Sequence, residues 1–135
     1  MKVLVDSSVW ADFFNAFTSR ESLALERLIE SEEEICTCGV VVSEVFQGFK
    51  KDETSGKLAD LFGALLFLEP SGIAPYFRAA DVYRTLRKRG ITVRSTIDCL
   101  IAVLADDNDC YLLAKDKDLR DIVASGVVDV PLWPA

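Results

Sequence analysis

The sequence predicts an α/β fold: a mostly parallel central sheet of about five strands, flanked by helices on both faces. Three observations support this fold class. Short apolar runs alternate with longer segments whose hydrophobic residues recur at helical spacing. The chain has 135 residues, half of them hydrophobic, which is enough for one buried core. No repeat, linker or low-complexity tract divides it, so residues 1–135 are expected to form a single domain.

The chain begins with one expected strand and two expected helices. KVLV at 2–5 is a short apolar run that suits a buried strand, and Asp6 ends it. A helix is expected from Ser8 to about Phe17. The segment 22–34 is amphipathic and ends in acidic residues, so it predicts a second helix. Its apolar residues expected to face inward are Leu23, Leu25, Leu28 and Ile29.

The middle of the chain continues the alternation. EICTCG at 34–39 predicts the second strand, and VVVSEVFQGF predicts a helix that begins at about Val41. Residues 57–65 predict another helix, and LLFLEP at 65–70 predicts the third strand. Helices therefore separate successive strands, which is the arrangement that parallel strands need.

The last third of the chain adds three helices and two strands. A long helix is expected at 75–89. STIDCLIAVLA at 95–105 predicts the next helix, whose apolar face consists of Ile97, Leu100, Ile101 and Leu104. CYLLA at 110–114 predicts the fourth strand, 117–124 a helix and 127–130 a last short strand. Right-handed crossovers between such strands give a sheet covered on both faces.

The composition excludes several kinds of active site. The chain has four cysteines and no histidine. Ser-His-Asp triads, Cys-His pairs and histidine-driven ribonuclease chemistry are therefore excluded. The lack of both histidine and a CxxC motif argues against a zinc site, so the cysteines are interpreted as small buried hydrophobes. Any catalytic equipment is expected to be mainly carboxylate.

The apolar runs and the cysteines also bear on localisation. The longest apolar runs are far shorter than a membrane span, and the N-terminus does not resemble a signal peptide. Cysteines without a secretion signal are typical of a reducing compartment. We therefore expect a cytoplasmic protein with no membrane partner.

The charge is unevenly distributed. The net charge of −7 argues against indiscriminate nucleic-acid binding. The stretch Arg78–Arg94 is the exception, with six basic residues and one acid. Two interpretations stay open: an ordinary solvated helix face, or a local phosphate-binding stripe. The RNA-binding candidates under the second interpretation are Arg84, Arg87, Lys88 and Arg94.

Carboxylates occur where the fold would bring them together. Asp6 ends the first strand, and Asp116 follows the fourth by two residues. Neighbouring strands are about 5 Å apart, so both carboxylates would reach one centre beyond the strands' carboxyl ends. Glu44 lies early in the helix after the second strand, and Asp98 early in the helix before the fourth. We therefore expect the four to converge.

Each carboxylate also has a structural explanation. Asp6 and Asp116 suit helix N-caps, and Glu44 would complement a helix dipole in its first turn. Asp98 follows Ser95 at nearly the spacing of a capping box. Caps do not need apolar surroundings, however, whereas Glu44 and Asp98 are embedded in apolar stretches where an unpaired charge is costly. Taken together, the four favour one acidic site.

Four segments resemble the successive motifs of the PIN domain: VLVDSSVWADFF, VVSEVFQGF, STIDCLIAVLA and LLAKDKDLRDIV. The closer resemblance is to VapC-type toxins of bacterial and archaeal toxin–antitoxin pairs, and it covers essentially the whole chain. No single motif is specific, but their order and the chain length together are a strong signal. The resemblance implies a PIN-like fold and a ribonuclease.

The resemblance assigns roles to individual residues. It implies that Asp6, Glu44 and Asp98 bind Mg²⁺ or Mn²⁺. Asp116 matches the fourth acidic residue of the family, and Asp118 is the alternative for that position.

Three further positions match or depart from the family pattern. Ser8 matches a small hydroxyl residue that supports the first aspartate. Lys115 stands where a neutral residue or histidine is frequent, and it could pair with a carboxylate and weaken metal binding. Leu119 stands where phenylalanine is usual.

The chemistry of the four acids agrees with this assignment. Crowded carboxylates raise one another's pKa, and a divalent cation resolves the conflict. Oxygen ligands without histidine or thiolate suit Mg²⁺ or Mn²⁺. Together with the ribonuclease that the resemblance implies, this chemistry predicts an endoribonuclease in which a metal-activated water hydrolyses RNA, leaving a 5′-phosphate and a 3′-hydroxyl.

The resemblance further implies two protein partners. A cognate antitoxin would cover the groove and insert a basic side chain among the carboxylates. A homodimer is also implied, for which Trp10, Phe13 and Phe14 are candidate contacts, with burial in the core as the alternative for each.

Other functions were weighed against a ribonuclease. A receiver domain needs an acceptor aspartate after the third strand, where only Glu69 is found, and a haloacid-dehalogenase-like phosphatase needs the second acid that DSS lacks. A catalytically inactive PIN-like module that binds RNA or protein is the main alternative. The sequence leaves the RNA target, the number of metal ions and the identity of the antitoxin open.

Overall fold

The structure is a computed structural model that describes residues 1–49 and 52–135. Within those residues the central sheet has four parallel strands in the order β3-β2-β1-β4. They are β1 (Lys2–Val5), β2 (Glu34–Cys38), β3 (Leu66–Leu68) and β4 (Tyr111–Leu113). Leu4 pairs with Cys36 on one side and with Leu112 on the other. The carboxyl end of β1 is therefore flanked by those of β2 and β4.

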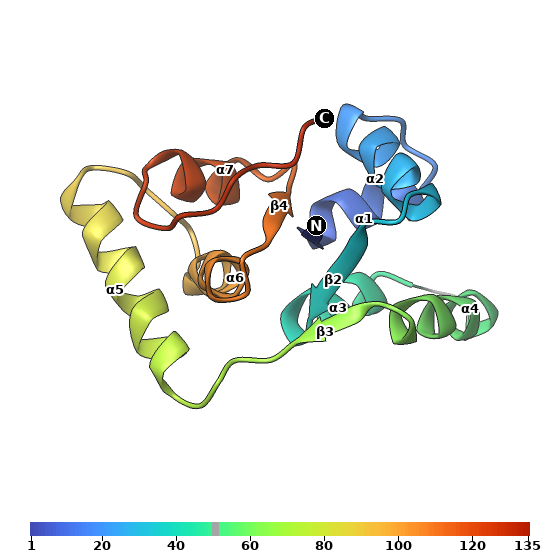
Figure 1. Ribbon diagram of the computed structural model, residues 1–135, viewed down its shortest axis with the longest axis horizontal. Coiled ribbons are helices and arrows are strands. Elements are labelled where there is room, and N and C mark those ends of the chain that lie inside the picture. Colours follow the sequence, from blue (N-terminus) through green and yellow to red (C-terminus); the bar gives the residue numbers. More distant parts are fainter. Residues whose placement is uncertain (50–51) are drawn as a thin grey trace.

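Helices surround this sheet (Figure 1). Their bounds are α1 (Ser7–Phe14), α2 (Arg20–Glu30), α3 (Gly39–Gln47), α4 (Asp52–Gly63), α5 (Ala74–Lys88), α6 (Thr96–Asp107) and α7 (Lys117–Ala124). From β1 the chain moves outward to β2 and β3, and it then crosses back to β4 on the other side of β1. Because the connections are right-handed, this change of direction puts α1 and α2 on one face of the sheet and α5 and α6 on the other. The predicted α/β class with a parallel sheet is confirmed. No helix of the described residues is long and apolar enough to cross a membrane.

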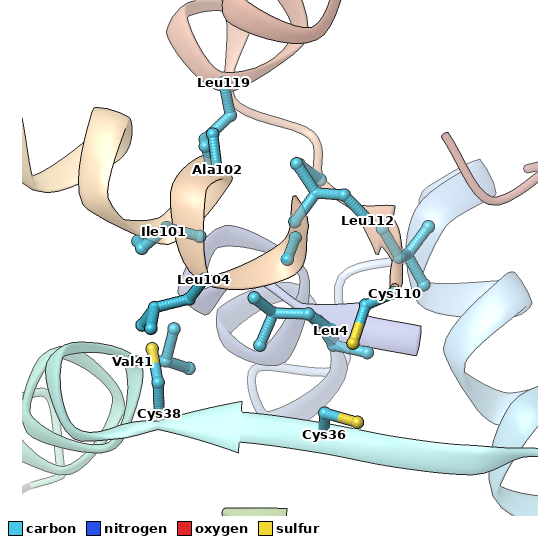
Figure 2. Packing of buried hydrophobic residues seen from close by; sticks show 14 of the residues in the cluster. Leu4, Cys36, Cys38, Val41, Ile101, Ala102, Leu104, Cys110, Leu112 and Leu119 are labelled. Atoms are coloured by element: carbon cyan, nitrogen blue, oxygen red, sulfur yellow. The ribbon is translucent and has the colours of Figure 1, made fainter. Parts of the chain in front are cut away.

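The core includes residues of α1 and α2 as well as of α6, and one part of it lies between the sheet and α6. Figure 2 shows Ile101 and Leu104 of α6 packed together with Leu4 of β1 and Cys38 of β2. Leu4 is completely buried, as expected for a residue of the central strand. All four cysteines are buried and free, which confirms their interpretation as small hydrophobes. The rigid core thereby fixes the carboxyl ends of β1 and β4.

The predicted last strand at 127–130 is wrong. Val128 and Val130 are buried, as strand residues would be, but the Asp129 N–H donates to the Asp106 carboxylate at 3.2 Å instead of to a neighbouring strand. The chain meets the sheet only at Pro131, whose carbonyl accepts the Leu112 N–H at 3.0 Å. The Trp133 N–H donates to the Leu112 carbonyl at 2.9 Å, and Leu112 forms an isolated parallel bridge with Leu132. The sheet of about five strands is thus one of four, with an edge bridge.

Two predicted apolar faces are only partly right. In α2, Leu25 and Leu28 are buried, but Leu23 and Ile29 are 42% and 39% exposed. The buried face of α2 therefore includes fewer of its apolar residues than the sequence predicted. In α6, Ile101 and Leu104 are buried and Leu100 is half-buried, whereas Ile97 is 46% exposed because it lies in the first turn, beyond the edge of the core.

The aromatic residues of α1 belong to the core. Trp10 is fully buried and stacks on Phe14 at 5.5 Å between ring centroids. Phe13 and Phe14 are half-buried against the same cluster. Trp10 is therefore wrong as a candidate dimer contact, because packing against Phe62 of α4 covers its ring.

Candidate active site

One cavity, of about 330 Å³, is lined by all four predicted carboxylates. Asp6 is the N-cap of α1 directly after β1, and Asp116 is the N-cap of α7 after β4. Glu44 projects from α3, and Asp98 from the first turn of α6. Residues far apart in the sequence are thereby brought to one place at the carboxyl end of the sheet.

Asp6 is the most deeply placed of these acids, at 4% exposure. Its backbone N–H donates to the Leu113 carbonyl of β4 at 2.9 Å, which fixes it between two strands. The Ser8 hydroxyl donates to its Oδ2 at 2.7 Å, and the Lys115 N–H donates to the Ser8 Oγ at 3.3 Å. Burial raises the pKa of Asp6, and the nearby Asp116 charge adds to the rise, while the Ser8 hydrogen bonds oppose it. Ser8 thus lies where its supporting role was predicted.

Asp98 is an acid of the cavity whose pKa is strongly raised. Ser95 caps its helix by accepting the Ile97 N–H at 3.0 Å. The carboxyl group of Asp98 is half-buried and lines the same cavity as the other acids. Burial first, and then the charges of Asp116 and Asp6, raise its pKa from 3.8 to about 7. The carboxylate is therefore in an environment that disfavours its ionised form.

Glu44 is the most exposed of the four acids. Partial desolvation and then the Asp6 charge raise its pKa above the ordinary value. The Asp6 charge thus raises the pKa values of two acids from different helices, Glu44 and Asp98. The charges of Asp6 and Asp116 therefore contribute to the raised pKa values of the acids around them.

The donor set fits a hard divalent cation, although the ligands are not preassembled. All four side chains offer carboxylate oxygens, the donors that Mg²⁺ and Mn²⁺ prefer. Across residues 1–49 and 52–135, no three acidic or cysteine side chains are close enough to hold one ion as they stand. The raised pKa values of Asp6, Glu44 and Asp98 show that added positive charge would be stabilising there.

Asp118, the alternative fourth acid, does not line the cavity. It is buried, and its Oδ2 accepts both the backbone N–H of Arg94 at 3.1 Å and the Arg94 Nε at 2.8 Å. These hydrogen bonds to Arg94 hold the pKa of Asp118 below its usual range. Arg94 also reaches Asp116, with 3.4 Å between its Nη2 and Oδ1. Of the two candidates, Asp116 is the one at the cavity.

Lys115 does not pair with the four predicted ligands as the sequence suggested it could. Its ammonium lies 3.0 Å from the Asp12 carboxylate and above the Phe17 ring, 4.7 Å from the ring centroid. This pairing holds the Lys115 charge at Asp12 of α1, and neither residue is among those that line the cavity. The departure from the family pattern at this position therefore gives no reason to expect weaker metal binding.

The basic stretch divides into two parts. Arg84, Arg87 and Lys88 are exposed on α5, and none of the three is among the described residues that line the cavity. Arg84 pairs with Asp81, and Arg87 lies over the Tyr83 ring. Arg94 is separate, because it lies in the loop before α6 and contacts the acids directly.

The cavity also contains residues that the sequence analysis missed. Its wall continues from the carboxylates to the aromatic and amide side chains Phe14, Asn15, Gln47 and Phe49. Their types and spacing carry no signal that would have selected them. The link between Arg94 and Asp118 was missed as well, because 24 residues separate the two in sequence.

The chain belongs to the PIN domain family, whose model matches residues 3–124. Within that family it groups with the VapC proteins. It is 33% identical over 123 residues to a VapC ribonuclease of Mycobacterium bovis, and the match covers 90% of this chain and 91% of the relative. The same values hold for ribonuclease VapC11 of Mycobacterium tuberculosis.

Solved structures agree on the fold. The chain is similar to VapBC2 from Rickettsia felis, determined bound to a DNA fragment from its promoter, with a TM-score of 0.73, 20% identity and 98% coverage of both chains. It is also similar to VapBC-1 from nontypeable Haemophilus influenzae, with a TM-score of 0.72, 14% identity and coverage of 99% of this chain and 98% of that one. The predicted PIN-like fold is thereby confirmed.

Proposed function

We propose that this chain is a divalent-metal-dependent endoribonuclease and the toxin of a type II toxin–antitoxin pair. The observation that carries the proposal is the convergence of Asp6, Glu44, Asp98 and Asp116 on one cavity. The chain's membership of the VapC group, whose curated relatives are named ribonucleases, supports RNA as the substrate.

The acids would hold Mg²⁺, or Mn²⁺ in its place. Asp6, Glu44 and Asp98 are the proposed ligands, and Asp116 would complete the site or orient the attacking water. A bound ion would lower the pKa of that water and neutralise charge that builds up on the phosphodiester. Because the ligands are not preassembled, we expect side-chain rotation of Glu44 and Asp98 toward the fixed Asp6 when the cation binds.

Hydrogen bonds within the chain hold two of these acids in position, and the surroundings of a third raise its pKa. Ser8 and the strand contact to Leu113 hold Asp6 in place, so its carboxylate is the fixed point of the site. The Asp118 N–H donates to Asp116 Oδ1 at 3.1 Å, which orients that carboxylate at the start of α7. Asp98, with its pKa raised to about 7, would release a proton when a cation binds at neutral pH.

Substrate and partners complete the proposal. The exposed Arg84, Arg87 and Lys88 of α5 would contact the RNA backbone outside the cavity. Hydrolysis would leave a 5′-phosphate and a 3′-hydroxyl.

The similar solved structures are of VapBC proteins, which supports a cognate antitoxin for this chain as well. A homodimer is also proposed. With Trp10 buried, the candidate contacts that remain are Phe13 and Phe14, which are half-buried.

One observation favours a second candidate, a PIN-like module that binds RNA or protein without cleaving it. Among the described side chains no three ligands stand ready for a metal ion. Cleavage of total cellular RNA by purified, antitoxin-free protein in Mg²⁺, Mn²⁺ or EDTA distinguishes the two. We expect metal-dependent cleavage that Asp6→Asn abolishes. Full-rate cleavage by Asp6→Asn would refute the ligand assignment, and RNA binding without cleavage in any metal would favour the second candidate.

A further inference from the structure

Arg94 is exposed and yet tightly held at the rim of the acidic cavity. Its side chain is 77% exposed, but Asp118 accepts both its backbone N–H and its Nε, at 3.1 and 2.8 Å. A third contact joins Nη2 to Asp116 Oδ1 over 3.4 Å. Three contacts thus hold this long side chain in one direction, toward a carboxylate that lines the cavity.

The way in which Arg94 is held leaves most of its hydrogen-bond donors free. A guanidinium carries five N–H donors, of which Asp118 takes the one on Nε. The two Nη groups carry the other four, and the contact to Asp116 engages one of them. The remaining donors form a planar fork that matches two oxygens of a phosphate. Asp118 therefore supports the guanidinium from behind and leaves its outer edge for a ligand.

Charge explains what such a ligand would be. None of the described residues that line the cavity is basic, and four of them are acidic. An RNA phosphate that approaches these acids would be repelled unless positive charge lies nearby. The two basic side chains next to Asp116 in sequence pair with other acids, Lys115 with Asp12 and Lys117 with Asp121. Arg94 is thus placed where the approaching anion needs a partner.

We propose that Arg94 binds a nonbridging oxygen of the RNA phosphodiester at the scissile bond, and that Asp118 is the residue that positions it. This inference rests on the proposed ribonuclease function and adds to it. It separates Arg94 from the basic residues of α5, and it gives Asp118 a role other than metal binding.

The alternative is that the pair only ties the loop before α6 to α7. Arg94→Gln removes the charge, and Arg94→Lys keeps the charge but loses the fork. Asp118→Asn removes the support while Arg94 remains. The matched control is Arg120→Gln, which removes the same charge from an arginine of α7 that also pairs with an acid, Glu21, at 3.6 Å.

The test measures RNA binding separately from cleavage. Binding of a fluorescein-labelled single-stranded RNA of mixed sequence is followed by anisotropy in Ca²⁺ at several salt concentrations. Arg94→Gln is expected to weaken binding about 10- to 100-fold, the effect of one charge-assisted hydrogen-bonding group. The slope of log Kd against log salt should fall by about 0.7, the value for one phosphate contact on a single strand.

The other variants set the limits of the result. Arg94→Lys should bind with intermediate affinity and keep the salt slope, and Asp118→Asn should resemble Arg94→Lys. Arg120→Gln should match the wild type. In Mg²⁺, Arg94→Gln should lower kcat/KM for RNA cleavage by at least the factor lost in binding.

Unchanged RNA affinity and salt slope in Arg94→Gln, with a lower Tm, would overturn the inference and leave a purely structural pair. In that case metal-dependent cleavage by the wild type would still stand, so the proposed function would survive. A wild type that neither binds nor cleaves RNA would overturn both.

Discussion

Asp98→Asn is predicted to stabilise the metal-free protein while it abolishes RNA cleavage. The substitution keeps the shape of the side chain but removes a charge that its surroundings disfavour. A rise in pKa from 3.8 to about 7 corresponds to a ceiling of about 4 kcal/mol for the cost of ionising Asp98 in the folded state. Because solvent reaches the half-buried carboxyl group, we expect about 1–3 kcal/mol of this at pH 8.

The sign of the pH dependence follows from the raised pKa. Between pH 4 and pH 7 the unfolded chain carries an ionised Asp98, whereas the folded chain binds a proton there. The cost of folding with this group therefore grows as the pH rises through this window, and it levels off above about 7. The advantage of Asp98→Asn over the wild type should accordingly be larger at pH 8 than at pH 5.5.

Urea unfolding in EDTA at these two pH values measures the difference. Asp60→Asn, which changes an exposed carboxylate of α4, is the matched control and should stay within about 0.5 kcal/mol of the wild type. Added Mg²⁺ should stabilise the wild type and leave Asp98→Asn unaffected. A destabilised Asp98→Asn, or a difference independent of pH, would refute the electrostatic reasoning.

Three further predictions concern the cation, the nearby lysine and the core. Mn²⁺ affinity, followed by electron paramagnetic resonance, should rise with pH up to about 7, since Asp98 must lose its proton to bind the ion; an affinity that is flat from pH 5.5 to 8 would argue against Asp98 as a ligand. Lys115→Met should leave Mn²⁺ affinity within about threefold of the wild type, because Lys115 pairs with Asp12; a marked gain in affinity would show that its charge competes with the metal. Leu4→Ala should lower the free energy of unfolding by about 2–5 kcal/mol, because it leaves a void in the central strand; a loss under 1 kcal/mol in urea unfolding would contradict this packing.

Local patterns were sufficient for most of the fold. The helix predicted at 117–124 coincides with α7, and apolar runs located all four strands of the described sheet. The strand predicted at 127–130 was wrong because apolar residues there are buried without pairing to a neighbouring strand. Val128 and Val130 are inside, but backbone donors in that segment bind a side chain and not a strand. The exposed Ile97 and the buried Trp10 show the same limit, since which apolar residues face the core depends on the neighbouring elements.

The predicted topology was sufficient to place the four acids at one site. Strand ends and helix starts predicted that Asp6, Glu44, Asp98 and Asp116 share one edge of the sheet, and all four line one cavity. The sequence did not determine whether Asp116 or Asp118 lines the cavity. The answer depends on Arg94, which binds the Asp118 carboxylate from a loop 24 residues earlier in the chain.

The central claim is that a cation held by these acids makes the chain a ribonuclease. The most direct test titrates Mn²⁺ into metal-free protein and measures bound ion and RNA cleavage in the same samples. We predict that cleavage follows bound Mn²⁺ with one apparent Kd, that Asp98→Asn loses both, and that Asp60→Asn keeps both. Cleavage that persists in EDTA, or bound Mn²⁺ without any cleavage, would contradict the account.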